Sequence, residues 1–203
     1  MATELADVGV VACGALARHV SDVARDRRWT VRVYPLPPLL HNRPQRIAPE
    51  VDAELTRVRP WHDRLFVAYA ECGTGGALEE VLTRHGVQRL PGSHCYDVFA
   101  GVQRIAGLLT EEPGTYFLTD YLLRSFARSV VVELGLDRFP ELREDYFGNY
   151  RRVVWLAQDA GDGDLVGSAR AAAAILGLPL TIIDVGVGGL AAALMPLRSG
   201  GGC

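Results

Sequence analysis

The chain has 203 residues, of which 49% are hydrophobic and 22% charged, a composition typical of a folded protein with one sizeable core. Its net charge of −3 provides no basic surface for nucleic acid, so nucleic-acid binding is excluded from the expected functions. All 21 basic residues are arginine, which excludes mechanisms that need a Schiff-base or phosphate-binding lysine.

The termini and the most apolar stretch suggest neither export nor membrane insertion. Glu4 and Asp7 stand where a signal peptide would be positively charged. The stretch 178–197 is as long as a membrane span, but Pro179 and Asp184 interrupt it. We therefore expect a cytoplasmic protein without a membrane partner. In that reducing compartment, cysteines serve more often as metal ligands or reactive groups than as disulfides.

Strand and helix patterns alternate along the first half of the chain. The continuous apolar run Val8–Ala12 indicates a strand buried on both faces. The four prolines within 35–44 predict a stiff, helix-breaking loop. The other elements expected here are helix 15–24, strand 30–34, helix 45–58, strand 64–69, helix 76–85, strand 87–90 and helix 95–109.

The alternation continues in the second half, where Thr119 is a plausible N-cap. The expected elements are strand 115–118, helix 120–127, an Arg/Glu-rich helical segment 136–150, strand 153–157, helix 164–176, strand 180–185 and helix 189–194. This pattern predicts a single α/β domain over residues 1–198, followed by a flexible glycine-rich tail, 199–203. We expect a three-layer, Rossmann-like fold with a mostly parallel sheet of six or seven strands flanked by helices.

Three cysteines follow expected strands of this sheet. Cys13 comes after the first strand, Cys72 after the third and Cys95 after the fourth, each before a helix. Ligands of such sheets bind beyond the carboxyl ends of the strands, and a helix N-terminus lowers the pKa of a thiol. Three thiolates on one edge predict a metal centre, and we favour a [4Fe–4S] cluster with one iron open to substrate.

Other interpretations of the three cysteines stay open. Zn²⁺ would bind the same thiolates, with His94 or Glu71 as an adjacent fourth ligand. A metal-free nucleophile and buried structural thiols are further alternatives. Cys203, on the glycine tail, is interpreted as incidental.

Polar residues near the cysteines are candidates for proton transfer and substrate binding. Glu71, His94 and Asp97 would act as general acids or bases, although Asp97 would equally serve the dipole of its helix. An anionic substrate would be bound by the loop residues His41, Asn42 and Arg43. The alternative is that these are ordinary polar residues of a solvent-exposed loop. Backbone N–H groups of the glycine-rich run would cradle a phosphate or carboxylate. That run consists of Gly73, Thr74, Gly75 and Gly76.

Six motifs in order along residues 8–190 resemble the bacterial and archaeal family called domain of unknown function 1638. They read VACGALA, LPPLLHNRP, AECGTGG, HCYDVFAG, YFLTDYLLRSF and LGLDRFPELREDYFGNYRRVVWLAQ. The resemblance implies a single α/β domain and places all three cysteines of the expected site inside family motifs. It implies no particular activity, and the Ser-Gly-Gly-Gly-Cys tail lies outside it.

The leading hypothesis is a metal-dependent enzyme of the lyase or transferase type. The open iron would polarise a small polar or sulfur-containing substrate for elimination or group transfer. The alternatives are a zinc-thiolate enzyme for methyl or thiol transfer and a non-catalytic metal carrier or accessory protein. The expected partner is a small-molecule substrate, and a homo-oligomer or a partner enzyme stays open.

Overall fold

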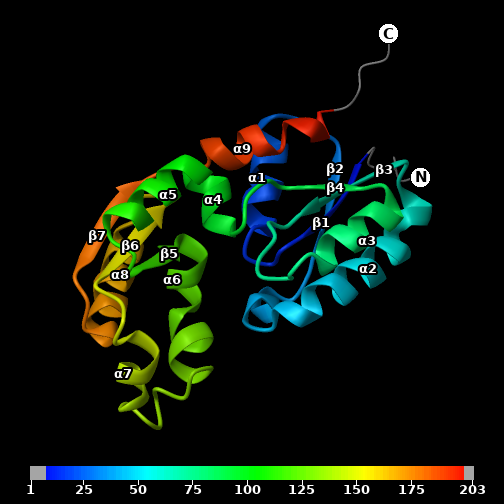
Figure 1. The fold of residues 1–203 in the computed structure, drawn as a ribbon. Helices are drawn as coiled ribbons and strands as arrows, with labels where there is room; N and C mark the ends of the chain where they lie inside the picture. Colours follow the sequence, from blue (N-terminus) through cyan, green and yellow to red (C-terminus); the bar gives the residue numbers. More distant parts are fainter. Residues whose placement is uncertain (1–7, 199–203) are drawn as a thin grey trace. The chain divides into compact units, whose positions relative to one another are not determined.

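The computed structural model describes residues 8–198, which form two compact units (Figure 1). The first unit comprises residues 8–98 and 187–198, and the second is Phe99–Gly186. The α/β class, with parallel strands flanked by helices, is confirmed. The seven strands lie in two sheets of four and three, whereas the strand pattern suggested one. The segments 1–7 and 199–203, with Glu4, Asp7 and Cys203, lie outside the described residues.

The sheet of the first unit has the order β2-β1-β3-β4, and all neighbouring strands are parallel. Its strands are β1 (Val8–Ala12), β2 (Val31–Pro35), β3 (Arg64–Ala68) and β4 (Gln88–Arg89). β1 is buried along its whole length, as its apolar run predicts. Ala12 pairs with both Pro35 and Ala68, so these three strands end level with one another. The chain runs from β1 outward to β2 and then crosses to β3, which makes the β1–β3 boundary the switch point of the sheet.

Helices cover both faces of this sheet, because right-handed crossovers that run in opposite directions place their helices on opposite faces. In Figure 1, α2 and α3 lie side by side on one face and α1 lies on the other. The helices of this unit are α1 (Ala17–Asp26), α2 (Ile47–Val58), α3 (Ala77–His85), α4 (Cys95–Ala100, which reaches into the second unit) and α9 (Gly188–Ala193). The short 3₁₀ turns are Pro38–Asn42, Pro44–Arg46, Arg59–Trp61 and Met195–Leu197. The last of these lies beside α1, where the Arg27 guanidinium contacts the Met195 sulfur at 3.7 Å.

A buried polar pair joins β2 to the segment before β3. The Tyr34 hydroxyl lies 2.7 Å from Nε2 of His62, and both side chains are buried. The His62 ring also lies against β1, where a Cβ at Gly9 would stand only 2.6 Å from Cδ2 of the ring. This tyrosine hydroxyl is therefore satisfied inside the core, as buried polar groups usually are.

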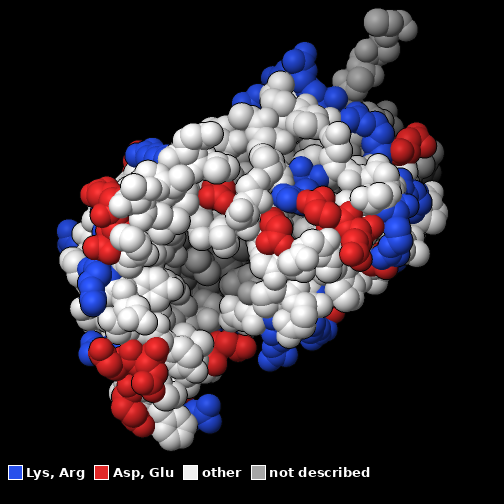
Figure 2. All heavy atoms as spheres, in the orientation of Figure 1, with Lys and Arg blue, Asp and Glu red and all other residues white. Residues whose placement is uncertain are grey.

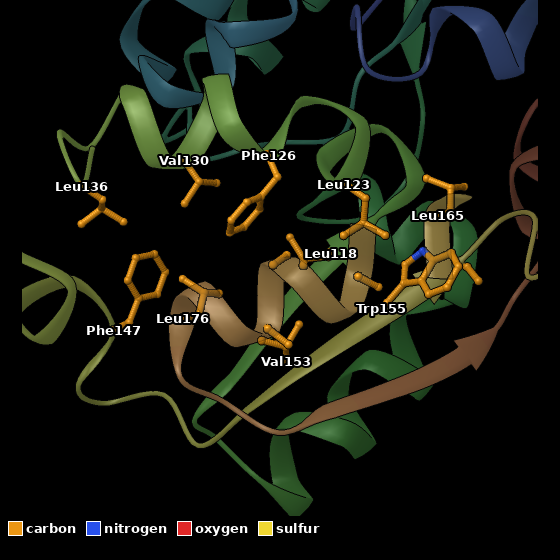
Figure 3. Close-up of a cluster of buried hydrophobic side chains, with 14 residues drawn as sticks. Leu118, Leu123, Phe126, Val130, Leu136, Phe147, Val153, Trp155, Leu165 and Leu176 are labelled. Atoms are coloured by element: carbon orange, nitrogen blue, oxygen red, sulfur yellow. The ribbon is translucent and has the colours of Figure 1, made fainter. Parts of the chain in front are cut away.

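The second unit is built on three parallel strands in the order β5-β6-β7. The strands are β5 (Thr115–Thr119), β6 (Arg152–Ala157) and β7 (Leu180–Asp184), and the helices are α5 (Val102–Glu111), α6 (Asp120–Phe126), α7 (Leu142–Phe147) and α8 (Gly163–Leu176). A π-helical turn, Ala127–Val132, continues α6. Side chains from strands and helices form one apolar core (Figure 3). Trp155 of β6 and Leu165 of α8 are almost fully buried there.

Asp120 links the end of β5 to the loop after β6. Its Oδ1 accepts hydrogen bonds from Nε1 of Trp155 at 2.9 Å and from the backbone N–H of Gln158 at 3.0 Å, and its Oδ2 accepts one from the N–H of Asp159 at 2.9 Å. The side-chain oxygen of Gln158 in turn accepts the N–H of Asp120 at 2.9 Å. The carboxylate is 4% exposed, so these donors replace the water that burial removes.

Two helical segments differ from the sequence-based expectation. The helix expected over 95–109 is divided into α4 and α5 at Gly101, whose φ of 85° interrupts the helix. The Arg/Glu-rich segment expected as a helix over 136–150 is helical only at Leu142–Phe147, and Figure 2 shows acidic side chains gathered around it. These exposed acidic residues are Glu133, Asp137, Glu141, Glu144 and Asp145. Pro140 lies inside the expected helix and cannot continue one that begins before it, so the helix is limited to the residues that follow.

Within residues 8–198, every helix is too short or too polar to cross a membrane.

Candidate three-cysteine site

Cys13, Cys72 and Cys95 follow β1, β3 and β4 at the carboxyl edge of the first sheet. The N–H of Cys13 donates to the carbonyl of Ala68 at 3.0 Å, which continues the β1–β3 pairing by one residue. Cys13 and Cys72 therefore stand on the two sides of the switch point, where ligands of parallel α/β sheets bind. The expected placement of the three cysteines on strands one, three and four matches this topology.

Backbone hydrogen bonds bring the Cys72 loop beside the loop that precedes Cys95. The N–H of Glu71 donates to the carbonyl of Gly92 at 3.2 Å, and the N–H of Cys72 donates to the carbonyl of Ser93 at 2.7 Å. Two residues later, Cys95 begins α4. These two loops run alongside each other without a regular strand pairing, so sequence periodicity alone does not reveal their contact.

The environment of the three thiols disfavours their charged form. Burial raises the pKa of Cys13 above its usual range. Burial and the charge of Cys13 raise the pKa of Cys72 to about 12. Burial, Cys13 and Cys72 together raise the pKa of Cys95. As thiolates, the three side chains would therefore repel one another, and a bound cation would offset that repulsion.

The direction of these pKa shifts is opposite to the one expected from helix N-termini. Backbone N–H groups of Cys95 and Tyr96 do lower the pKa of the Cys95 thiol, but burial raises it by more. Among residues 8–198, no three His, Cys, Asp or Glu side chains are arranged so that they would hold a metal ion as they stand.

Cys72 has an unusual backbone conformation. Its φ is 52°, in the left-handed region, and the following Gly73 has a φ of 78°. A residue with a Cβ pays roughly 1–2 kcal/mol in this region, whereas glycine adopts it freely. A thiol therefore stands at a turn position that glycine would fill with less strain. Such outliers cluster at functional sites, which supports a functional role for Cys72.

Glu71 organises the glycine-rich loop from inside. Its carboxylate accepts hydrogen bonds from the Gly73 N–H at 2.7 Å, the Thr74 hydroxyl at 2.7 Å and the Gly76 N–H at 3.5 Å. The hydrogen bond from Thr74 and those from the loop N–H groups lower the pKa of Glu71. The N–H groups expected to cradle a substrate anion at Gly73 and Gly76 thus already face an internal carboxylate. Gly75, between them, has space for a Cβ on every side.

Asp97 holds the loop that carries His94 into α4. One carboxylate oxygen, Oδ2, accepts the backbone N–H groups of Ser93 at 2.8 Å and His94 at 2.9 Å. A Cβ at Gly92 would stand 2.8 Å from the Cβ of Asp97, so glycine is needed for this close approach. The buried Asp97 therefore caps its own helix, which is the alternative role that the sequence left open.

The His94 imidazole differs from the two carboxylates in being half-exposed. Its ring stacks on Tyr96 with a centroid distance of 4.7 Å and an interplanar angle of 11°. Its Nδ1 lies 3.9 Å from the Asp97 carboxylate, and 52% of the side chain is exposed. Of the three residues expected to transfer protons, His94 is the one whose ring stands at the surface beside Cys95.

The proline-rich loop packs onto the turns that carry Cys13 and Cys72. A Cβ at Gly14 would stand 2.5 Å from the carbonyl oxygen of Leu36 and 2.9 Å from Cα of Pro38. A Cβ at Gly73 would stand 3.6 Å from Pro44. This loop therefore lies beside both turns. Within it, His41 and Asn42 belong to the 3₁₀ turn Pro38–Asn42, and Arg43 follows; Asn42 and Arg43 are exposed.

Tyr69 is a residue of this site that sequence reasoning assigned only to a strand. It follows β3 directly and is 0% exposed, and its hydroxyl lies against the Cys13 thiol without forming a regular hydrogen bond among the described residues. Burial and the neighbouring Cys13, Cys72 and Cys95 raise its pKa. The available sequence signal was a hydroxyl-bearing residue at the end of an apolar strand, three positions before Cys72.

Comparison with protein families identifies one match. The family model described as "Protein of unknown function (DUF1638)" matches residues 35–194, which is most of the chain. The chain belongs to the DUF1638 family. Cys72 and Cys95 lie within the DUF1638 match, together with the proline-rich loop, while Cys13 precedes its first residue. Searches of curated proteins and of solved structures found no match.

Proposed function

We propose that this protein is a metal-dependent enzyme in which Cys13, Cys72 and Cys95 hold a [4Fe–4S] cluster. The observation that carries this proposal is that three cysteines follow strands of one parallel sheet at its carboxyl edge, two of them at the switch point, and that Cys13 raises the pKa of the other two. Parallel α/β sheets bind their ligands at this position. Three soft thiolate ligands favour iron–sulfur clusters, zinc or Cu(I) over hard cations.

The origin of the three ligands in separate loops suits a cluster. Each thiolate of an iron–sulfur cube binds a different iron, so the ligands need not converge on one atom. Zinc instead requires every sulfur to lie about 2.3 Å from a single ion. The three thiols also need a cation to stabilise their deprotonated form, because desolvation and mutual repulsion oppose it.

The bound cluster would supply a Lewis-acidic iron, free of cysteine, that polarises a small polar or sulfur-containing substrate. The chain itself holds the surrounding loops in place. Glu71 fixes the Cys72 loop and Asp97 fixes the Cys95 loop, each through hydrogen bonds to backbone N–H groups. Both carboxylates remain candidates for proton transfer. His94 is a stronger candidate than either carboxylate, because its imidazole is half-exposed and the residue precedes Cys95 directly.

The proline-rich loop is the proposed substrate-binding segment. It lies against the Cys13 and Cys72 turns, and Arg43 brings a guanidinium that suits a carboxylate or phosphate group. Asn42 completes this proposed contact from the adjacent 3₁₀ turn, and His41 of the same turn, whose side chain lies outside the described part of the structure, stays a candidate. A substrate with one anionic group and one polar or thiol group fits these residues and the proposed metal centre together.

Anaerobic purification tests the proposal directly. We expect a brown protein with about four iron and four sulfide ions per chain, and loss of both in Cys13→Ser, Cys72→Ser and Cys95→Ser. Cys203→Ser is the matched control and retains them. A colourless protein with one zinc ion lost in the same three variants would replace the cluster with the zinc-thiolate alternative. Rapid loss of the metal to a chelator would favour the alternative that the protein is a non-catalytic metal carrier. Absence of both metals from anaerobic material overturns the proposal.

A further inference from the structure

The Tyr69 hydroxyl is a buried polar group that faces a weak partner, the Cys13 thiol. The side chain is 0% exposed, and its oxygen forms no regular hydrogen bond within the described residues. The other buried tyrosine of this sheet, Tyr34, meets His62 at 2.7 Å. Leaving a hydroxyl unsatisfied inside a protein costs about 1–3 kcal/mol. A native structure that retains such a group calls for a ligand or a function to explain it.

The surroundings of this hydroxyl are the three thiols. It is near enough to Cys13 for each group to shift the pKa of the other, and Cys72 and Cys95 raise the pKa of Tyr69 as well. The backbone explains this proximity. The residue before Tyr69, Ala68, accepts the Cys13 N–H, and Cys72 follows three residues later. Tyr69 thus lies on the β3 side of the switch point, next to the residue that pairs with Cys13.

A thiol and a thiolate differ greatly as partners for this hydroxyl. A protonated thiol is a weak hydrogen-bond acceptor, so Tyr69 gains little from its neighbours in the metal-free protein. A thiolate is a charged acceptor and forms a stronger bond with an O–H donor. Binding of a metal deprotonates a coordinating thiol outright. The weak contact between Tyr69 and the Cys13 thiol in the metal-free chain would therefore become a strong hydrogen bond when the site is filled.

We propose that Tyr69 is a positioning residue whose hydroxyl donates a hydrogen bond to a metal-bound thiolate of the three-cysteine site. This inference rests on the proposed function, because it needs a metal centre on Cys13, Cys72 and Cys95. Groups that hydrogen-bond to metal ligands orient those ligands and tune the metal, and their loss typically lowers metal affinity about 10- to 100-fold. Hydrogen bonds to cluster sulfurs also raise the reduction potential.

The test compares Tyr69→Phe with Tyr34→Phe, which removes a buried hydroxyl of the same sheet that already has a partner. In the metal-free protein, Tyr69→Phe should leave the melting temperature unchanged or raise it, whereas Tyr34→Phe should lower it. In protein loaded with the metal that the wild type carries, Tyr69→Phe should lose that metal to a chelator about 10- to 100-fold more readily. If the metal is iron, the cluster potential should become more negative. Tyr34→Phe should retain its metal like the wild type.

The outcomes separate this inference from the function on which it rests. If Tyr69→Phe lowers the metal-free melting temperature as Tyr34→Phe does, the hydroxyl has another partner, such as a buried water, and the inference is overturned. Unchanged metal retention and unchanged potential in Tyr69→Phe also overturn it, while the metal site itself stands. If the wild type binds neither iron nor zinc, both proposals fail together.

Discussion

Glu71 and Asp97 show how single carboxylates shape the loops that carry Cys72 and Cys95. Each accepts backbone N–H groups from the loop beside it, and each has a cysteine as a near neighbour in the chain. Hydrogen bonds from N–H groups to charged acceptors are among the stronger ones in proteins. The carboxylates of Glu71 and Asp97 therefore stabilise the conformation of the two loops. The thiols are then the groups through which a ligand would bind.

Replacing Glu71 by Gln should change how stability depends on pH. The hydrogen bonds from Thr74 and the loop N–H groups lower the pKa of Glu71 in the folded protein. Its contribution is therefore fully present above the unfolded value of about 4.3 and is lost as the pH falls through the lower folded value. We expect Glu71→Gln to cost about 1 kcal/mol at pH 7.

Urea unfolding between neutral and acidic pH measures this effect. The difference between wild type and Glu71→Gln should shrink as the pH falls below the unfolded pKa. Glu80→Gln, on the exposed side of the neighbouring α3, is the control and should change stability little at any pH. A difference that stays constant down to acidic pH would contradict the assigned hydrogen bonds.

Among the secondary-structure elements, the bounds of the strands agree with those expected from the sequence more closely than the bounds of the helices do. β1, β3 and β6 are apolar runs buried from several sides, and their expected bounds agree with the structure to within one residue. The helix expected over 95–109 is instead interrupted at Gly101, because a positive φ cannot continue an α-helix. Apolar periodicity continues across such a break, so the pattern alone does not reveal it.

The junction of β5, α6 and β6 depends on the Asp120 carboxylate. Asp120→Asn replaces one acceptor oxygen with an NH₂ group that would face an N–H donor of Trp155, Gln158 or Asp159. We expect a loss of about 1–3 kcal/mol in the free energy of unfolding, together with a change in Trp155 fluorescence. Denaturant unfolding followed by fluorescence measures both effects. Asp184→Asn, at the exposed end of β7, should leave stability and fluorescence nearly unchanged; equal losses in the two variants would refute this role of Asp120.

At the level of the whole molecule, the division into two units confines the proposed metal site to one of them. Cys13, Cys72 and Cys95 all belong to the first unit, while the core of Figure 3 belongs to the second. A ligand that binds only the folded state stabilises the part of the protein to which it binds. Different parts of a protein open with different free energies, and hydrogen exchange reports each of them.

Removing the metal should therefore lower hydrogen-exchange protection mainly in the first unit. We expect faster exchange in the turns 12–16, 69–77 and 92–98, and little change in β6 and α8 of the second unit. Mass spectrometry of metal-loaded and metal-free protein, digested after exchange, measures this directly. Equal losses in both units would show that the metal stabilises the chain as a whole, and losses limited to the second unit would place the site elsewhere.

The sequence by itself determined the local features of this protein. Apolar runs predicted the strands, glycine and proline predicted the loops, and the position of each cysteine after a strand followed from the chain order. These are short-range properties, set by backbone sterics and by the period of hydrophobic residues. Membership of the DUF1638 family was likewise evident from motifs in the chain.

Only the tertiary structure decided which strands are neighbours, where one sheet ends and the next begins, and what surrounds each polar group. Strand order placed Cys13 and Cys72 across the switch point, and burial raised the pKa of the thiols against the influence of the helix termini. The internal use of Glu71 and Asp97, and the buried hydroxyl of Tyr69 beside Cys13, also became visible there. These properties depend on desolvation and on contacts between residues distant in the chain, which local patterns do not encode.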